Sequence, residues 1–266
     1  MARTKILVPG EKMYGYTSAI VSFSTGIDST GVLYWAIKNF PKDKIWLLYC
    51  DTGAEYPIND GIVKNISKFL GIKYKILRHP KGFLELLLTE RFKFPDAKNR
   101  WCTSILKTGV TDKWIRANRE ELGNKVLFLT GERKDESRSR ALLPESEYHS
   151  TTLWTKRKGE FECHWHRPVL DYEKGKMFEF GKDLGIGAHP CYEYLPRCSC
   201  MICVLMPDRF CKENAKKYPE IIKQFVDAEK EIKHTWKNKK SLEEIFNSCQ
   251  DIDDIEIGYE QIKLTL

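Results

Sequence analysis

The sequence lacks any long hydrophobic run, and this absence bears on where the protein works. No apolar stretch in the 266 residues approaches the roughly 18 to 20 residues that a membrane-spanning helix needs. The first residues, Met1 to Lys5, are not followed by the apolar core of a signal peptide. We therefore expect a cytoplasmic protein that does not associate with a membrane.

Internal repeats, low-complexity tracts and Pro/Gly/Ser-rich linkers are also missing, so nothing marks a sharp domain boundary. A chain of this length can bury one substantial core but not two full domains with separate cores. Its composition, 42% hydrophobic and 30% charged, is typical of a soluble globular fold. We expect a main nucleotide-binding domain over residues 1–185 and a cysteine-rich, mainly helical extension packed on it over residues 186–266.

The charge balance points to anionic partners without identifying one. The formal net charge is +7, and clustered Lys and Arg side chains release counterions when they neutralise phosphates. A solvated basic surface accounts for this charge nearly as well. Nucleic acid is therefore a candidate partner that needs support from motifs.

Cysteines are more informative than charge. Five of the nine lie between Cys191 and Cys211, and in a reducing compartment such crowding is typical of metal or cluster ligands rather than disulfides.

Hydrophobic periodicity predicts the fold class. Strand-like runs at residues 19–23, 45–49, 74–77 and 126–130 alternate with helical patterns at 31–37, 58–70 and 110–121. This order predicts an α/β fold with a Rossmann-like parallel sheet covered by helices on both faces. The pattern weakens beyond about residue 145 and returns as a helix over 212–233.

A small polar turn lies between the first strand and the first helix, where backbone N–H groups and the helix dipole form an anion site. The turn is neither a GxGxxG nor a Walker loop, and a helix cap with a glycine turn is the alternative. Hydroxyl groups there can donate to phosphate, Gly26 allows close approach, and Asp28 can position Mg²⁺. The predicted nucleotide-binding residues in this region are Ser22, Ser24, Thr25, Gly26, Asp28 and Ser29.

Residues 24–29 resemble the SGGxDS signature of PP-loop enzymes, which split ATP between its α and β phosphates, although Thr25 and Ile27 depart from the commonest form. The resemblance continues in three further blocks at residues 49–57, 100–107 and 131–140. These four blocks, in this order, resemble the phosphoadenosine phosphosulfate reductase family and its relatives, whose fold is adenine nucleotide alpha hydrolase-like. ATP and Mg²⁺ are the cofactors that the resemblance implies.

Several residues in these blocks are candidates for the site. Asp51 follows the second strand, where its carboxylate can bind a ribose hydroxyl or a metal, with a capping role as the alternative. Gly131 follows the fourth strand, and the arginines after it suit bidentate contacts with phosphate or sulfate. The predicted catalytic residues are Asp28, Lys107, Arg133 and Arg138.

The cysteines have a counterpart in relatives that carry an iron–sulfur cluster. By resemblance to those relatives, a 4Fe–4S cluster would be held by Cys102, Cys191, Cys200 and Cys203. Cys198 or Cys211 could replace Cys191. Zinc is the alternative occupant, because four thiolates suit it equally well.

Two branches of the family suggest different reactions. Sulfonucleotide reductases use a nucleophilic cysteine in a C-terminal Glu-Cys-Gly-type tail, which this sequence lacks; Cys249 is the nearest substitute. The chain also resembles the DndC-type ATP pyrophosphatases of DNA phosphorothioation.

We therefore expect an ATP-dependent sulfur transferase that acts on nucleic acid, with DNA favoured over tRNA, and takes sulfur from a cysteine desulfurase or another donor. The alternatives are a thiol-dependent reductase of adenylyl sulfates and a non-catalytic nucleotide-binding subunit. A homo-oligomer is compatible with the sequence.

Overall fold

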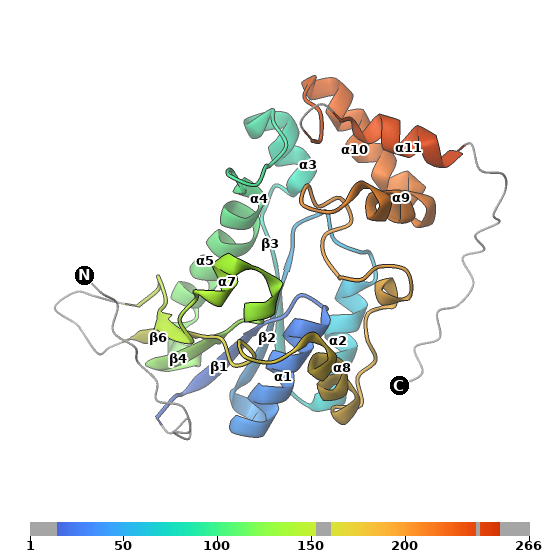
Figure 1. Ribbon diagram of the computed structural model, residues 1–266. Coiled ribbons are helices and arrows are strands. Elements are labelled where there is room, and N and C mark those ends of the chain that lie inside the picture. Colours follow the sequence, from blue (N-terminus) through green and yellow to red (C-terminus); the bar gives the residue numbers. More distant parts are fainter. Residues whose placement is uncertain (1–14, 153–160, 238–239, 251–266) are drawn as a thin grey trace.

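A six-stranded sheet forms the centre of the computed structural model, which describes residues 15–152, 161–237 and 240–250 (Figure 1). The strand order is β3-β2-β1-β4-β6-β5, and every pair is parallel except β5 with β6. The pairing is mainly parallel because crossover segments that contain helices connect successive strands of the central sheet. The strands are β1 (Ser18–Ser22), β2 (Ile45–Asp51), β3 (Lys73–Arg78), β4 (Lys125–Leu129), β5 (Ser146–Tyr148) and β6 (Glu162–His166).

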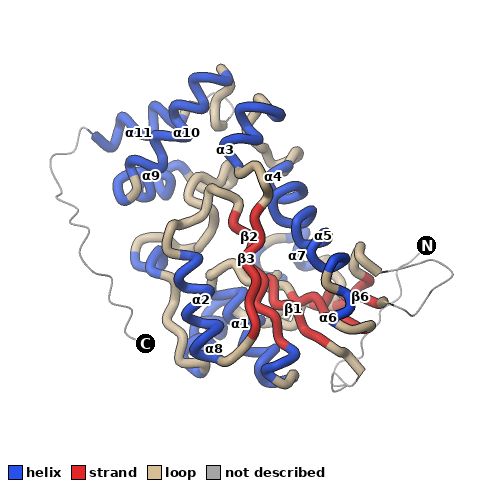
Figure 2. The backbone as a smooth tube through the Cα atoms, turned by 180° about the vertical axis from the view of Figure 1, so that it is seen from behind, coloured by secondary structure: helices blue, strands red, loops and turns tan. Residues whose placement is uncertain are grey.

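Alternating side chains of the central strands divide the interior into two layers. In β1, Ala19 and Val21 pack beneath α1 (Ile27–Asn39), whereas Ile20 packs on the opposite face with residues of α5 (Val110–Ala117). Both faces of a parallel sheet are buried, so its strands are apolar on both sides. Figure 2 shows the resulting helix layers: α1, α2 (Asn59–Leu70) and α8 (Lys174–Asp183) lie on one side, and α5 and α6 (Arg119–Leu122) on the other.

The predicted fold class is confirmed, and all four predicted strands are present with ends shifted by one or two residues. Two predicted helices are each divided in the structure. The pattern at 110–121 forms α5 and α6, and the pattern at 212–233 forms α9 (Asp208–Lys217) and α10 (Pro219–Ile232). Pro219 explains the second break, because proline disfavours helical backbone in the residue before it and is well placed at the start of a helix.

Strand β6, which the hydrophobic pattern did not predict, owes its burial to histidines with hydrogen-bond partners. His164 Nδ1 lies 2.5 Å from the Tyr16 hydroxyl, and His166 Nδ1 lies 2.7 Å from Ser146 Oγ. Burial lowers the pKa of His166 to about 4, so the ring is neutral near pH 7. A polar strand of this kind is stable only because its partners come from other elements.

A third core lies away from the sheet, at the top of Figure 1. Helices α9, α10 and α11 (Leu242–Gln250) pack there against residues that follow β3, including Phe83 and Trp101. The buried carboxylate of Glu229 accepts hydrogen bonds from the backbone N–H groups of Trp236 and Leu242, which fixes the turn between α10 and α11. The segments that follow β3 are α3 (Phe83–Leu86), η2 (Leu87–Arg91), α4 (Trp101–Thr103) and η3 (Ser104–Gly109).

The domain division at residue 185 stays a prediction. Within the described part of the chain, no helix combines the length and apolar character needed to cross a membrane.

Gly31 lets α1 pack against α8, which makes it a test of this fold. A Cβ atom at Gly31 would lie 2.3 Å from Met177 Sδ, so we expect Gly31→Ala to lower the free energy of unfolding by about 1–3 kcal/mol. Helix propensity alone predicts the opposite sign, since alanine stabilises a helix interior by up to about 1 kcal/mol relative to glycine. Urea denaturation measures the difference.

Gly61→Ala in α2 is the matched control, because nothing lies within 4 Å of its added Cβ. We expect this variant to be unchanged or more stable by roughly 0.5–1 kcal/mol. Equal stability of the two variants would show that the Met177 side chain moves aside without cost, which would contradict tight packing of Met177 against Gly31.

Candidate active site

The site forms at the point where the strand order reverses. The chain runs outward from β1 to β2 and β3, then crosses back to place β4 on the other side of β1. Ligands of doubly wound sheets bind at such a switch point, outside the carboxyl ends of the strands. Here it brings the turn after β1 against the turn after β4. A Cβ atom at Gly131 would lie 2.9 Å from the backbone C and O atoms of Asp28, so the two turns are in direct contact.

The turn after β1 is held by its own polar groups. Ser29 Oγ accepts a hydrogen bond from the Ser24 backbone N–H (3.1 Å) and donates to the Gly26 carbonyl (2.8 Å). Thr25 has a φ of 62°, in the left-handed region that favours glycine. The Ile27 N–H at the start of α1 donates to the Tyr192 hydroxyl (3.1 Å). Residues 24–29 are thus preformed at a helix N-terminus, as an anion site requires; we call them the phosphate loop.

Two predicted catalytic residues meet beside this loop. Arg133 Nε donates to Asp28 Oδ1 over 2.7 Å, and the Arg133 guanidinium also pairs with Asp135. The Arg133 side chain is only 5% exposed, so these carboxylates supply the charge partners that a buried cation needs. Burial raises the pKa of Asp28, and the Arg133 pairing opposes that shift.

A cavity of about 840 Å³ opens at the carboxyl ends of β1, β2, β4 and β6. It reaches from the phosphate loop at Ser24 to Lys107 in η3. One wall is aromatic, and the rest carries hydroxyl and charged groups, a combination typical of small-molecule sites. Its lining includes Ser22, Phe23, Ser24, Tyr49, Cys50, Glu55, Arg100, Lys107, Phe128, Glu132, Arg140, Tyr148, His149 and Trp165.

At the far end of the cavity, a thiol lies against the predicted lysine. Lys107 Nζ is 2.9 Å from Glu55 Oε1 and 3.7 Å from Cys200 Sγ. Cys200 Sγ is itself 3.2 Å from Glu55 Oε1. Burial and then the Glu55 carboxylate raise the pKa of Cys200, and Lys107 opposes that shift, so the protonated thiol donates to Glu55.

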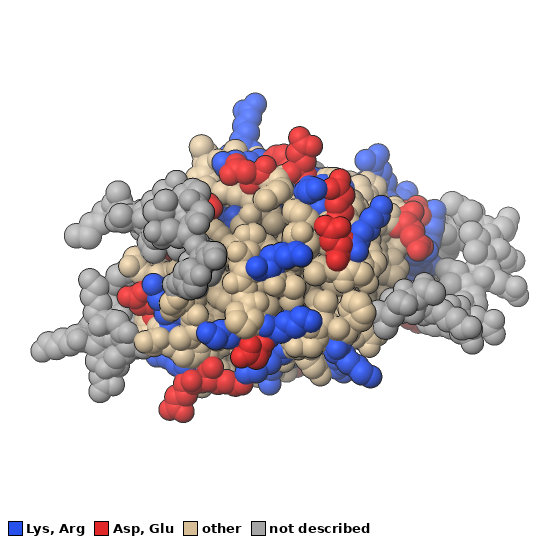
Figure 3. Space-filling model, turned by 90° about the horizontal axis from the view of Figure 1, so that it is seen from below, with Lys and Arg blue, Asp and Glu red and all other residues tan. Residues whose placement is uncertain are grey.

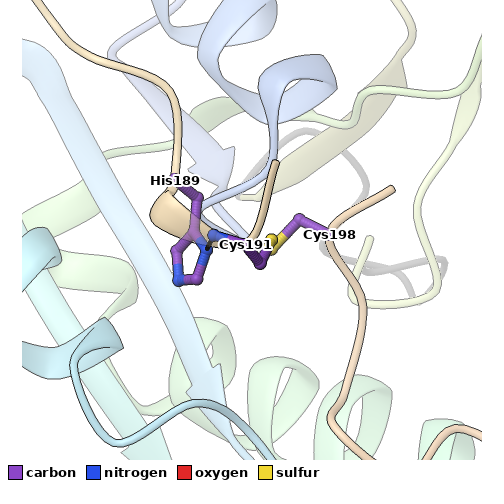
Figure 4. A group of neighbouring side chains, drawn as sticks. All are labelled: His189, Cys191 and Cys198. Carbon is purple, nitrogen blue, oxygen red and sulfur yellow. Dashed lines mark hydrogen bonds between the residues drawn. The ribbon is translucent and has the colours of Figure 1, made fainter. Parts of the chain in front are cut away.

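The described cysteines include two groups with different partners. The side chains of Cys102, Cys200 and Cys203 pack against the third core and form the first group, and burial raises the pKa values of Cys102 and Cys200. Cys191 lies in the second group, with His189 and Cys198, whose ligand atoms all lie within 4.8 Å of one another (Figure 4). The predicted set of four cysteines is thus drawn from both groups and stays a prediction.

Within the second group, hydrogen bonding is asymmetric. A hydrogen bond with Cys191 lowers the pKa of Cys198 to about 5, despite burial, and His189 adds to the shift. The pKa of Cys191 is raised, first by the same bond and then by burial. Cys211 is buried in the third core, and the side chain of Cys249 lies outside the described residues.

Other predicted site residues lie at the margin. Asp51 accepts a hydrogen bond from the Gly53 N–H (2.9 Å) and pairs with Arg78 (2.9 Å), so it holds the turn after β2. Arg138 is exposed in α7 (Arg138–Ala141) and is not part of the cavity lining, whereas Arg140 lines the cavity and pairs with Glu136.

Sequence reasoning missed Glu55 and Tyr192 as partners of the site, and it named Cys198 as an alternative cluster ligand but not as a neighbour of Thr25. Glu55 lies inside the block at residues 49–57, and Tyr192 follows Cys191, so both residues lie in or next to motifs that the sequence analysis had identified. No signal in the sequence indicated that the Tyr192 hydroxyl accepts a hydrogen bond from the Ile27 N–H of the phosphate loop, because the two residues lie 165 positions apart.

A preformed phosphate loop at the switch point of a doubly wound sheet defines a nucleotide-binding α/β protein of the PP-loop class. The chain belongs to the phosphoadenosine phosphosulfate reductase domain family, whose model matches residues 18–203. This membership places it among enzymes of the PP-loop superfamily and confirms the resemblance found in the motifs.

More distant likenesses are found among solved structures. A phosphoadenylyl-sulfate reductase from Candida auris, in a phosphate complex, is 15% identical with a TM-score of 0.44, over 66% of this chain and 77% of that one. The U34-tRNA thiolase NcsA from Methanococcus maripaludis, with its 4Fe–4S cluster, is 14% identical with a TM-score of 0.42, over 89% and 73%. An FMN adenylyltransferase from Candida glabrata is 9% identical with a TM-score of 0.39, over 62% and 48%. Curated proteins yielded no match.

The contact between Gly131 and Asp28 generates a prediction about nucleotide affinity. In Gly131→Ala the added Cβ meets the backbone of the phosphate loop, so the loop must shift. We expect a roughly tenfold or greater loss of affinity for a fluorescent ATP analogue, equivalent to about 1–3 kcal/mol of overpacking. Gly187→Ala, whose Cβ meets nothing within 4 Å, should bind the analogue like the parent protein. Unchanged affinity in Gly131→Ala would show that nucleotide binds elsewhere.

Proposed function

We propose that this protein is an ATP-dependent sulfur transferase that adenylylates an oxygen of a nucleic acid and then replaces that oxygen with sulfur. DNA is the favoured acceptor, with a phosphorothioate as the product. The DndC-like branch of the family, from which this preference comes, stays a prediction. The reaction itself is supported by the layout of the site.

One observation carries the proposal: a single cavity connects the phosphate loop at Ser24 with Lys107, against which Cys200 packs. A sulfur transferase must hold an activated phosphate and a source of sulfur within reach of one acceptor. Reacting groups held together in this way gain a large entropic advantage over free reactants.

In the proposed first step, an acceptor oxygen attacks the α phosphorus of ATP. The bond between the α phosphorus and the bridging oxygen breaks, and pyrophosphate leaves. In the second step, hydrosulfide attacks the activated phosphorus of the acceptor, its proton is released, and AMP leaves. The helix N-terminus at the phosphate loop stabilises negative charge on the phosphates, and Asp28 would hold Mg²⁺.

A cysteine desulfurase would deliver sulfur as a persulfide rather than as hydrosulfide. Each sulfur atom transferred from a persulfide then requires a two-electron thiol reductant, which becomes a disulfide.

The first cysteine group is suited to hold an iron–sulfur cluster. Cys102 comes from α4 and Cys200 and Cys203 from a loop almost 100 residues later, yet all three side chains pack against the same core. Thiolates are the usual ligands of such clusters. A bound cluster would supply a sulfur-rich, electron-accepting centre next to Lys107, and zinc is the alternative occupant.

A nucleic acid acceptor accords with the net charge of +7. The basic side chains are not gathered into one patch on the face seen in Figure 3, where Lys and Arg are interspersed with Asp and Glu. The proposal therefore does not include a large basic surface for nucleic-acid binding on that face.

The test is anaerobic incubation of the full chain with ATP, Mg²⁺, sulfide and a DNA duplex. We expect AMP and pyrophosphate in equal amounts, together with phosphorothioate in the DNA. Asp28→Asn should reduce AMP formation by roughly 100-fold or more, the scale on which one preorganised electrostatic group contributes to catalysis.

Asp43→Asn is the matched control, because Asp43 is exposed in η1 (Lys42–Lys44), which precedes β2 and so lies far from the carboxyl ends of the strands. It should retain full activity. Full activity in Asp28→Asn would contradict the role of that carboxylate. Sulfite release from an adenylyl sulfate would instead identify a reductase, and nucleotide binding without turnover a non-catalytic subunit.

A further inference from the structure

We infer that His189, Cys191 and Cys198 form a mononuclear zinc site beside the phosphate loop, separate from the Cys102, Cys200 and Cys203 group. Nothing in the proposed reaction requires this ion. The inference therefore stands or falls independently of sulfur transfer.

The donor set and its spacing suit one small ion. The His189 ring nitrogen and the two Sγ atoms lie within 4.8 Å of one another (Figure 4). Zinc bonds of about 2.3 Å to sulfur and about 2.0 Å to nitrogen place tetrahedral ligand atoms roughly 3.5–4 Å apart, so only a small contraction is needed. Two thiolates and a neutral imidazole also balance the charge of Zn²⁺, which lets the site be buried without a net charge.

The ring of His189 is held in the form that a metal ligand requires. Its Nε2 atom lies 2.9 Å from Asn59 Oδ1, while Asn59 Nδ2 donates to the Tyr49 hydroxyl over 3.0 Å. The amide is therefore oriented to accept a proton from Nε2, which leaves the lone pair on Nδ1. Histidine ligands of metals commonly donate their other N–H to such a partner.

In the structure Nδ1 accepts the backbone N–H of Cys191 (3.0 Å). Metal binding would exchange that hydrogen bond for coordination.

The site would tie the segment at residues 189–198 to the phosphate loop. Cys198 Sγ lies 3.8 Å from Thr25 Oγ1, and the Tyr192 hydroxyl accepts the N–H of Ile27. Three protein donors leave one position of a tetrahedral ion for an oxygen ligand. This position would lie near the phosphate loop, next to the bound nucleotide.

The assignment also divides the cysteines between two centres. If Cys191 and Cys198 hold zinc, the cluster loses the predicted Cys191. Two candidates then remain for a fourth thiolate: Cys211, buried in the core against which Cys102, Cys200 and Cys203 pack, and Cys50, which lies against Lys107 in the cavity.

The experiment measures zinc and iron in the full chain purified anaerobically, as the parent protein, Cys198→Ser and Cys203→Ser. We expect about one zinc ion per parent chain, as for a single three-ligand site. Cys198→Ser should lose zinc and keep iron, whereas Cys203→Ser should lose iron and keep zinc. Removal of Asn59 in Asn59→Ala should weaken zinc binding by roughly 10–100-fold.

X-ray absorption at the zinc edge of the parent protein provides a readout that needs no variant. One nitrogen and two sulfur neighbours, completed by a light atom, would support the site even if Cys198→Ser fails to fold. Four sulfur neighbours would place zinc among the other cysteines and overturn the inference. So would a folded parent chain that takes up neither Zn²⁺ nor Co²⁺, or loss of iron with retention of zinc in Cys198→Ser.

Discussion

The parallel pairing of β1 with β4 is the constraint on which the site depends. Val21 is paired with Leu129, so the turns that follow the two strands must lie side by side. Only a glycine at position 131 lets them touch, because a Cβ there would enter the backbone of Asp28. That contact places Arg133 against Asp28 and fixes one end of the cavity. The phosphate loop is therefore a product of sheet register as much as of its own residues.

The segment that follows α8 brings cysteine side chains to the same edge of the sheet. Residues 189–203 cross the carboxyl ends of the strands, where the Met201 N–H donates to the Ala54 carbonyl over 2.9 Å. This contact sets Cys200 beside Glu55 and Lys107, while Cys198 lies beside Thr25. One short segment thus places Cys198 beside the phosphate loop and Cys200 beside Lys107, which lines the far end of the cavity.

Some regions of the structure could be predicted from the sequence and others could not, and the reasons are physical. The strands at 19–23 and 126–130 are apolar on both faces, so their hydrophobic pattern suffices. Strand β6 could not be found in this way, because His164 and His166 are polar residues that are buried against partners from other segments, including Tyr16 and Ser146. The phosphate loop was predicted from local residue types. The grouping of the cysteines was not, because spacing along the chain does not say which thiols meet.

The sequence by itself determined the fold class, the phosphate loop and the family, since these follow from local periodicity and from short ordered motifs. Tertiary structure alone decided which charged groups are neighbours. It paired Arg133 with Asp28, turned Asp51 toward Arg78, and left Arg138 in solvent. It also separated Cys191 from Cys200 and joined it to His189 and Cys198. Arg133 and Asp28 are far apart along the chain, and no local pattern shows that His189, Cys191 and Cys198 meet, so the packing of the whole fold determines these contacts.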